Sequence, residues 1–197
     1  MNNHENIWGL KKGFILASSS KQRLALLETA GFYPEKTVAA DVDETPLPNE
    51  LPKEYVRRIA ISKASKVSKS HPGTFILAAD TIIAVGRRIM MKAPDENAAR
   101  RNLELLSGRG HKVYTGMCII TPDGRQISKT VISSVRIKAL SPQDIDILIK
   151  SKEWVGVSGY YIDGILSAFV LDIKGSYPNI VGLPIYQVGQ ILRGVLS

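Results

Sequence analysis

Hydrophobic and polar positions follow two different spacings along the chain, and this pattern predicts a mixture of helices and strands. Apolar residues recur every three or four positions in five segments, which is the spacing of a helix with one buried face. Gly31 provides a stop after the first segment, and Ser141 and Pro142 provide a cap and a first turn for the fourth. The helices are predicted at residues 24–30, 53–69, 96–106, 142–150 and 185–195.

Other segments are rich in β-branched and apolar residues without helical spacing, which is typical of strands. The strands are predicted at residues 14–17, 75–85, 112–121 and 126–138. Residues 75–85 form either one buried strand or two strands with a kink. The sequence Pro122-Asp123-Gly124 favours a tight turn, so the last two strands are predicted to pair as an antiparallel hairpin. Together these elements predict an α/β fold in which a mixed, twisted sheet is flanked by helices.

The length of 197 residues, with 44% hydrophobic and 22% charged residues, is typical of a single folded domain. We assign this domain to residues 13–197 and regard residues 1–12 as an N-terminal extension. The longest uncharged apolar runs are far shorter than the roughly 20 residues of a membrane-spanning helix. Residues 1–12 lack the basic start and apolar middle of a secretory signal, and the single Cys118 suits a reducing compartment. A cytoplasmic location is therefore expected, with no membrane partner.

The charge balance narrows the class of ligand. Lysine and arginine number 26 against 18 acidic residues, a net charge of +8 that favours nucleic acid, anionic membranes or phosphorylated small molecules. The basic residues are dispersed, aromatic residues make up only 7%, and no basic run is interleaved with aromatic side chains. Nucleic acid is therefore not expected to be the main ligand.

A serine-rich loop offers a first candidate site. Ser18, Ser19 and Ser20 follow the first predicted strand, and Arg23 lies on the opening turn of the next helix. Hydroxyl groups, free backbone N–H groups and a guanidinium at a helix N-terminus suit a phosphate group. The alternative is an ordinary serine cap.

Two charged residues interrupt apolar surroundings. Asp80 lies in the apolar run 75–83, where an unpartnered buried carboxylate would cost several kcal/mol. A metal ion, a lysine or a substrate water could compensate it, and a catalytic base is then plausible; alternatively, Asp80 faces solvent at a sheet edge. Lys63 falls within the apolar stripe of the helix 53–69. A buried ion pair would explain both residues, whereas snorkelling of the lysine is the alternative.

Two further candidates are less specific. Glu44 belongs to an acidic segment, residues 41–45, whose oxygens could bind a hard cation such as Mg²⁺. The same segment could equally be a solvated loop. Lys92 follows two methionines beside a turn, and its position alone indicates no function.

Taken in order, these segments resemble the Maf family of nucleoside triphosphate pyrophosphatases, and the likeness covers residues 13–195. Several separated motifs in the same order make chance similarity a poor explanation. The motifs lie at residues 16–23, 43–45, 62–64, 78–81, 92, 105–108, 111, 115–116, 156–164, 175–177 and 181–184.

The resemblance implies an elongated fold related to the inosine triphosphate pyrophosphatases, with two lobes around a cleft. It also implies hydrolysis of modified or surplus nucleoside triphosphates to the monophosphate and pyrophosphate, dependent on Mg²⁺ or Mn²⁺, in a cytoplasmic homodimer. Family members are associated with cell-division arrest. The alternative function is therefore a nucleotide-binding division regulator that acts mainly by binding.

By the same resemblance, Asp80 accepts a proton from the attacking water and joins Glu44 in holding the metal. Lys63 and Lys92 neutralise the negative charge that develops during the reaction. These roles suit phosphoryl chemistry, in which positioning and charge stabilisation do most of the work.

The resemblance also implies a set of substrate-binding residues. Ser18 and Arg23 would hold phosphates, and the positions linked to the choice of base are Gln22, Thr81 and Asp163. Thr81 matches the subgroup that acts on dTTP and UTP. Gln22 and Asp163 match neither that subgroup nor the one that acts on 7-methyl-GTP, so the sequence leaves the base open.

Overall fold

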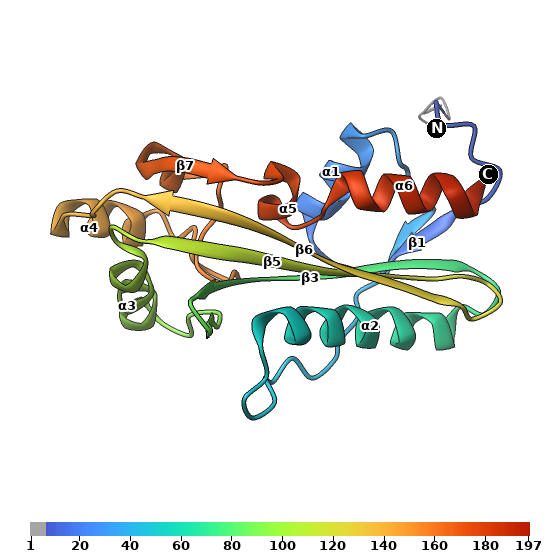
Figure 1. Cartoon of the computed structure of the whole chain (residues 1–197), viewed down its shortest axis with the longest axis horizontal. Coiled ribbons are helices and arrows are strands. Elements are labelled where there is room, and N and C mark those ends of the chain that lie inside the picture. Colours follow the sequence, from blue (N-terminus) through green and yellow to red (C-terminus); the bar gives the residue numbers. More distant parts are fainter. Residues whose placement is uncertain (1–6) are drawn as a thin grey trace.

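A mixed sheet extends along the length of the molecule (Figure 1). The computed structural model describes residues 7–197, and in this range the sheet has seven strands. Their order is β2-β1-β3-β5-β6-β7, with the short β4 paired to β3; β1 is parallel to β2 and β3, and all other pairs are antiparallel. The strands are β1 (Phe14–Leu16), β2 (Lys36–Thr37), β3 (Phe75–Val85), β4 (Arg88–Met90), β5 (Gly110–Ile120), β6 (Gln126–Ile137) and β7 (Val170–Lys174).

The structure confirms each helix that was predicted from a segment long enough to show helical spacing of apolar residues. The predicted segments correspond to α1, α2, α3, α4 and α6, and residues 75–85 form one continuous strand. The elements not predicted are β2, β4, β7, η1 and α5, which are too short to show a period. The helices are α1 (Lys21–Thr29), α2 (Pro52–Ser70), α3 (Glu96–Leu106), α4 (Pro142–Lys150), η1 (Ile165–Phe169), α5 (Tyr177–Val181) and α6 (Ile185–Leu196).

Strand alternation divides the core around β1 and β3 into two layers. Phe14 and Leu16 pack with residues of α1 and α6, whereas Ile15 and Ala17 pack with residues of α2. Figure 1 shows these helices on opposite faces of the sheet. Successive side chains of a strand alternate between faces, so this short buried strand contributes to both layers. The sheet at this end is therefore buried on both sides.

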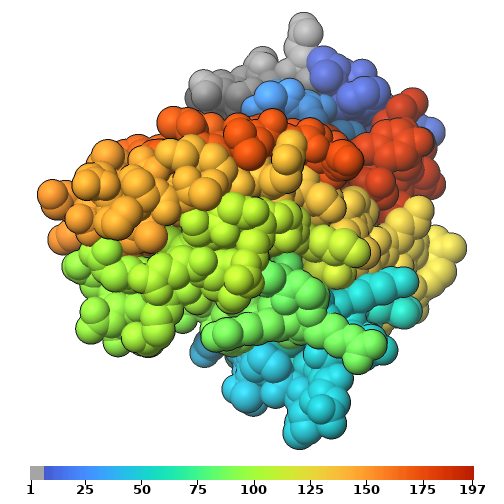
Figure 2. Space-filling model, turned by 60° about the vertical axis from the view of Figure 1, so that its left-hand side comes forward, coloured from blue at the N-terminus to red at the C-terminus, as the bar shows by residue number. Residues whose placement is uncertain are grey.

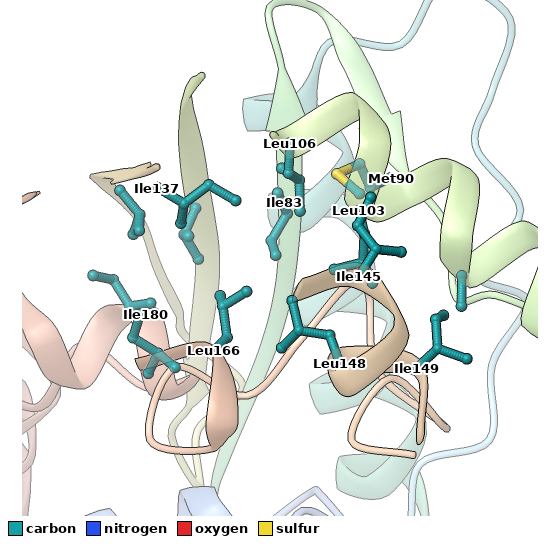
Figure 3. Packing of buried hydrophobic residues seen from close by; sticks show 14 residues of the cluster. Ile83, Met90, Leu103, Leu106, Ile137, Ile145, Leu148, Ile149, Leu166 and Ile180 are labelled. Atoms are coloured by element: carbon teal, nitrogen blue, oxygen red, sulfur yellow. The ribbon is translucent and has the colours of Figure 1, made fainter. Parts of the chain in front are cut away.

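The other end of the sheet has a core of its own. Residues from α3 and α4 pack with Ile83 on β3 and with the adjoining ends of β5 and β6 (Figure 3). Burying these apolar surfaces stabilises the end of the molecule remote from α2 and α6. The expectation of a mixed α/β sheet flanked by helices is confirmed, with separate hydrophobic clusters toward its two ends.

The described part of the predicted N-terminal extension packs on the domain. Trp8 stacks on Phe32 with ring centroids 5.5 Å apart and donates from Nε1 to the carbonyl oxygen of Ala30 at 2.8 Å. Lys11 N–H donates to the carbonyl oxygen of Leu196 at 2.8 Å. Residues 1–6 lie outside the described residues. Among residues 7–197, the structure contains no helix with the length and apolar character needed to cross a membrane.

Gly116 on β5 allows α2 to lie directly on the sheet. A Cβ atom at Gly116 would lie 2.2 Å from the carbonyl oxygen of Val56 in α2, far inside van der Waals contact. Because the obstructing atom is backbone, the helix itself would have to move.

We therefore expect Gly116→Ala to lower the free energy of unfolding by about 1–3 kcal/mol, the usual cost of overpacking. Urea unfolding followed by circular dichroism measures this change. Gly110→Ala is the matched control, because it starts the same strand and a Cβ there meets nothing within 4 Å. Equal stability of the two variants would contradict the close approach of α2.

Candidate active site

A gap in strand pairing exposes the middle of β3. On one side β3 pairs with β1 as far as Leu77 and with β4 from Ile83 onward, so residues 78–82 have no strand partner there. A cleft of about 770 Å³ lies beside this segment. Its walls come from the loop after β1, the loop before α2, the segment 156–161 and the end of α5. Figure 2 shows the loop before α2 and the start of that helix (cyan) at the edge of the molecule.

Three charged side chains meet on the α2 side of this cleft. Lys63 Nζ lies 2.7 Å from Asp80 Oδ1 and 2.6 Å from Glu44 Oε1. The side chains of Lys63 and Asp80 are only 10% and 9% exposed, while that of Glu44 is 34% exposed. The buried ion pair is therefore confirmed, and both alternatives, a solvent-facing Asp80 and a snorkelling Lys63, are wrong.

Glu44 also connects this cluster to an exposed lysine. Lys92 Nζ lies 3.5 Å from Glu44 Oε2, across the mouth of the cleft. Partial burial opposes the charge of Glu44, but the hydrogen bond and charge of Lys63, aided by Lys92, lower the pKa of this carboxyl below its ordinary value. Glu44 is therefore held as a carboxylate between two ammonium groups.

A second cluster lies on the opposite face of β3. Arg23 donates from Nη1 to Ser18 Oγ at 3.2 Å, from Nη2 to Thr81 Oγ1 at 3.2 Å, and from Nε to the carbonyl oxygen of Gly182 at 2.9 Å. Burial lowers the pKa of Arg23, and the charges of Asp80 and Glu44 oppose this shift. Arginine nevertheless remains protonated.

The helix start explains why Arg23 is so placed. Ser20 caps α1 by accepting from the N–H of Arg23 at 3.3 Å, while Ser18 Oγ accepts from the N–H of Ser20 at 3.2 Å. The serine loop thus contains an ordinary cap at Ser20, and the hydroxyl of Ser18 contacts the guanidinium of Arg23. The cap interpretation therefore holds for Ser20, whereas phosphate binding by Ser18 stays a prediction.

Adjacent residues of one strand therefore supply both clusters. Asp80 and Thr81 point to opposite faces of β3, as strand geometry requires. Because β3 has no strand partner at residues 78–82 on the edge away from β5, both faces open into the same cleft. The cleft therefore combines the carboxylate of Asp80 with the cationic groups of Arg23, Lys63 and Lys92, an arrangement suited to a polyanionic substrate that reacts with water.

The sequence matches the family described as Maf-like protein over residues 13–195. The chain belongs to the Maf family. A dTTP/UTP pyrophosphatase of Paramagnetospirillum magneticum is 50% identical over 181 residues, covering 91% of this chain and 95% of the relative. A nucleoside triphosphate pyrophosphatase of Ehrlichia canis is 47% identical over 184 residues, covering 93% of this chain and 96% of the relative.

Among solved structures, this Maf chain is similar to the Staphylococcus aureus Ham1 protein with a TM-score of 0.47 and 17% identity. That match covers 64% of this chain and 72% of the other. A nucleoside-triphosphatase / dITP/XTP pyrophosphatase from Mycobacterium abscessus has a TM-score of 0.43 and 21% identity, with the same coverage of 64% and 72%.

The residues that the Maf resemblance links to base choice are not all in one place. Gln22 and Thr81 line the cleft, and the hydroxyl of Ser20 donates to Gln22 Oε1 at 3.3 Å. Asp163 is exposed and is not among the residues that line the cleft. Its neighbours Tyr160 and Tyr161 do line it.

Sequence reasoning missed several residues of this Maf site. Tyr55 donates to the carbonyl oxygen of Glu44 at 2.7 Å, which ties the acidic loop to α2; burial raises the pKa of Tyr55. Tyr160 lines the cleft and hydrogen-bonds through its hydroxyl to His111 Nε2. Burial lowers the pKa of His111 to about 4, so this imidazole is neutral at physiological pH. Tyr55 is buried with the apolar residues of α2, whereas His111 and Tyr160 lie in motifs of the Maf resemblance that carried no assigned role.

The carboxylates of this site suit a metal ion whose other ligands are substrate phosphates and water. Lys63 holds two carboxylates, those of Asp80 and Glu44, and residues 7–197 contain no group of three or more His, Cys, Asp or Glu side chains placed to hold a metal. Mg²⁺ is commonly held by one or two carboxylates together with substrate phosphates and water. The Maf site therefore fits an ion that is shared with a bound phosphate chain.

Proposed function

We propose that this protein is a nucleoside triphosphate pyrophosphatase that hydrolyses its substrate to the monophosphate and pyrophosphate. The observation that carries the proposal is the buried carboxylate of Asp80, paired with Lys63 in a cleft that Arg23 and Lys92 also line. Relatives of 43% to 50% identity, named dTTP/UTP pyrophosphatases, support the same reaction. We therefore expect dTTP and UTP to be among the substrates.

Asp80 is the proposed proton acceptor. Its Oδ1 is held by Lys63 at 2.7 Å, and within residues 7–197 no protein group hydrogen-bonds to Oδ2. A water molecule can therefore donate to Oδ2. As the water oxygen bonds to phosphorus, its proton passes to Asp80, and the anhydride bond to the departing pyrophosphate breaks.

The cationic groups would bind the phosphate chain and stabilise its added charge. Ser18 and Arg23 approach it from the α1 side of the cleft, and Lys63 and Lys92 from the opposite side. Fixed positive groups in a partly desolvated cleft act more strongly than they would in water. We assign Ser18 and Arg23 to phosphate binding and the two lysines to charge stabilisation.

Asp80 and Glu44 are the proposed ligands of a divalent cation, Mg²⁺ or Mn²⁺. When bound, such an ion would offset the charge of the phosphate oxygens. Binding would require Lys63 to share or release the two carboxylate oxygens that it now contacts.

A panel of standard and modified nucleoside triphosphates tests the reaction. We expect release of pyrophosphate and nucleoside monophosphate in equal amounts with Mg²⁺ or Mn²⁺, fastest with dTTP or UTP, and loss of release when EDTA removes the cation. Anion-exchange chromatography resolves the products. Asp80→Asn purified in parallel controls for a contaminating phosphatase. Release of inorganic phosphate with nucleoside diphosphate, or no release from any triphosphate, would overturn the proposal.

A further inference from the structure

Behind Arg23, a ladder of buried hydroxyl groups crosses the sheet. Thr81 on β3 and Thr115 on β5 are cross-strand partners, and their Oγ1 atoms lie 2.9 Å apart. Thr115 is completely buried, and its Oγ1 lies 3.0 Å from the carbonyl oxygen of Asn179 in α5. The guanidinium of Arg23 is thus connected through two threonines to the backbone of α5.

The number of available protons determines which group donates in each of these hydrogen bonds. Each threonine has one hydroxyl proton, Arg23 can only donate, and a carbonyl oxygen can only accept. The N–H of Leu183 donates to Pro178 at 2.9 Å, so it does not serve the carbonyl of Asn179. The proton of Thr115 is therefore needed by Asn179.

The remaining proton then has one best position. Thr81 Oγ1 can also donate to the carbonyl oxygen of Gly182 at 3.2 Å, but that oxygen already accepts from Arg23 Nε at 2.9 Å. If Thr81 donates to Thr115, every polar group in this series of hydrogen bonds has a partner, and the lone pairs of Thr81 face Arg23. The other arrangements leave either a buried carbonyl or the contact between the two threonines without a proton.

The side chain of Asn179 also fixes α5 to the sheet through hydrogen bonds. Asn179 Nδ2 donates to Ser133 Oγ at 3.0 Å, and Ser133 Oγ donates to the carbonyl oxygen of Ser176 at 3.0 Å. Asn179 and Ser133 are 0% and 1% exposed. These bonds fix α5 on the sheet, and Gly182, which directly follows α5, presents its carbonyl to Arg23.

We propose that Thr115 is a positioning residue that sets the direction of the hydroxyl of Thr81 and thereby holds Arg23 ready for the phosphate chain. This inference rests on the proposed function. Thr115 does not line the cleft, so its effect passes through Thr81 and Arg23. Removing its hydroxyl leaves the buried carbonyl of Asn179 without its donor and leaves the proton of Thr81 free to turn.

Thr115→Val keeps the shape of the side chain and removes the hydroxyl. We expect KM for the preferred triphosphate to rise about two- to tenfold, the equivalent of one net hydrogen bond, with kcat much less affected. The Kd for inorganic tripolyphosphate, measured by calorimetry, should weaken by the same factor. Thr115→Ser restores a hydroxyl and is expected to restore both constants.

Thr130→Val is the matched control. Thr130 lies on β6 beside Gly116, and its buried Oγ1 has no hydrogen-bond partner within the described residues. The same substitution there should leave KM unchanged. Thr115→Ala repeats the test if the valine variant does not fold, as judged by thermal unfolding.

An active Thr115→Val or Thr115→Ala variant with wild-type KM and wild-type tripolyphosphate affinity would overturn the inference. So would a folded Thr115→Ser variant as impaired as the valine variant. A wild-type protein that releases no pyrophosphate would instead refute the proposed function. The tripolyphosphate measurement would still decide whether Thr115 positions Arg23.

Discussion

Replacing Asp80 by asparagine should lower kcat for pyrophosphate release by about 10²- to 10⁴-fold, the usual contribution of a positioned base. The amide keeps the shape of the carboxylate but cannot take a proton from water. Its oxygen can still accept from Lys63, which now lies 2.7 Å from Oδ1. We therefore expect the affinity for the triphosphate to change much less than kcat. Steady-state kinetics with the preferred triphosphate separates the two effects.

Asp146→Asn provides the control for this prediction. Asp146 is on α4, its side chain is 51% exposed, and it pairs with Arg100 at 2.8 Å. An exposed ion pair contributes little to stability, so the variant should match wild-type activity. A folded Asp80→Asn protein with wild-type kcat would remove Asp80 from the role of base.

The long elements were predictable because their side chains repeat a clear period. The buried stripe of α2 and the continuous apolar run of β3 were visible in the sequence, and each contained one charge that did not fit. Two opposite misfits in buried segments are explained by a buried pair, although a snorkelling lysine and a solvent-facing carboxylate were open alternatives. The 2.7 Å contact between Lys63 and Asp80 shows that the pair is the correct alternative, although the sequence could not show that Glu44 shares the same ammonium.

The second half of the site was not predictable by that reasoning. The bond from Arg23 to Gly182 spans 159 positions of the chain, and it depends on α5, a helix of five residues with no readable period. The gap in pairing beside residues 78–82 depends on where β1 ends and β4 begins, and β4 has only three residues. Such features arise from tertiary packing. The exposed position of Asp163 was likewise hidden, because its glycine-rich segment has no regular element.

Lys63→Met should lower kcat at neutral pH by roughly 10²- to 10³-fold, the usual loss when a charge-stabilising group is removed. Methionine can fill the apolar path of the lysine stem, but the ammonium that joins Asp80 and Glu44 is lost. The pKa of Glu44 is now below its ordinary 4.5, because partial burial is outweighed by Lys63 and Lys92. This ion pair thus stabilises the fold above that ordinary pKa, and the contribution disappears as pH falls through the lowered value.

The pH dependence distinguishes this effect from simple loss of structure. Without the ammonium, two carboxylates repel each other, and one of them keeps a proton to higher pH. The acid limb of the pH–rate profile should therefore move to higher pH, so that part of the lost activity returns at alkaline pH. Lys69→Met, an exposed position near the end of the same helix, should leave the profile unchanged. A folded Lys63→Met protein with wild-type kcat and an unmoved acid limb would show that the ammonium does not govern the carboxylate pair.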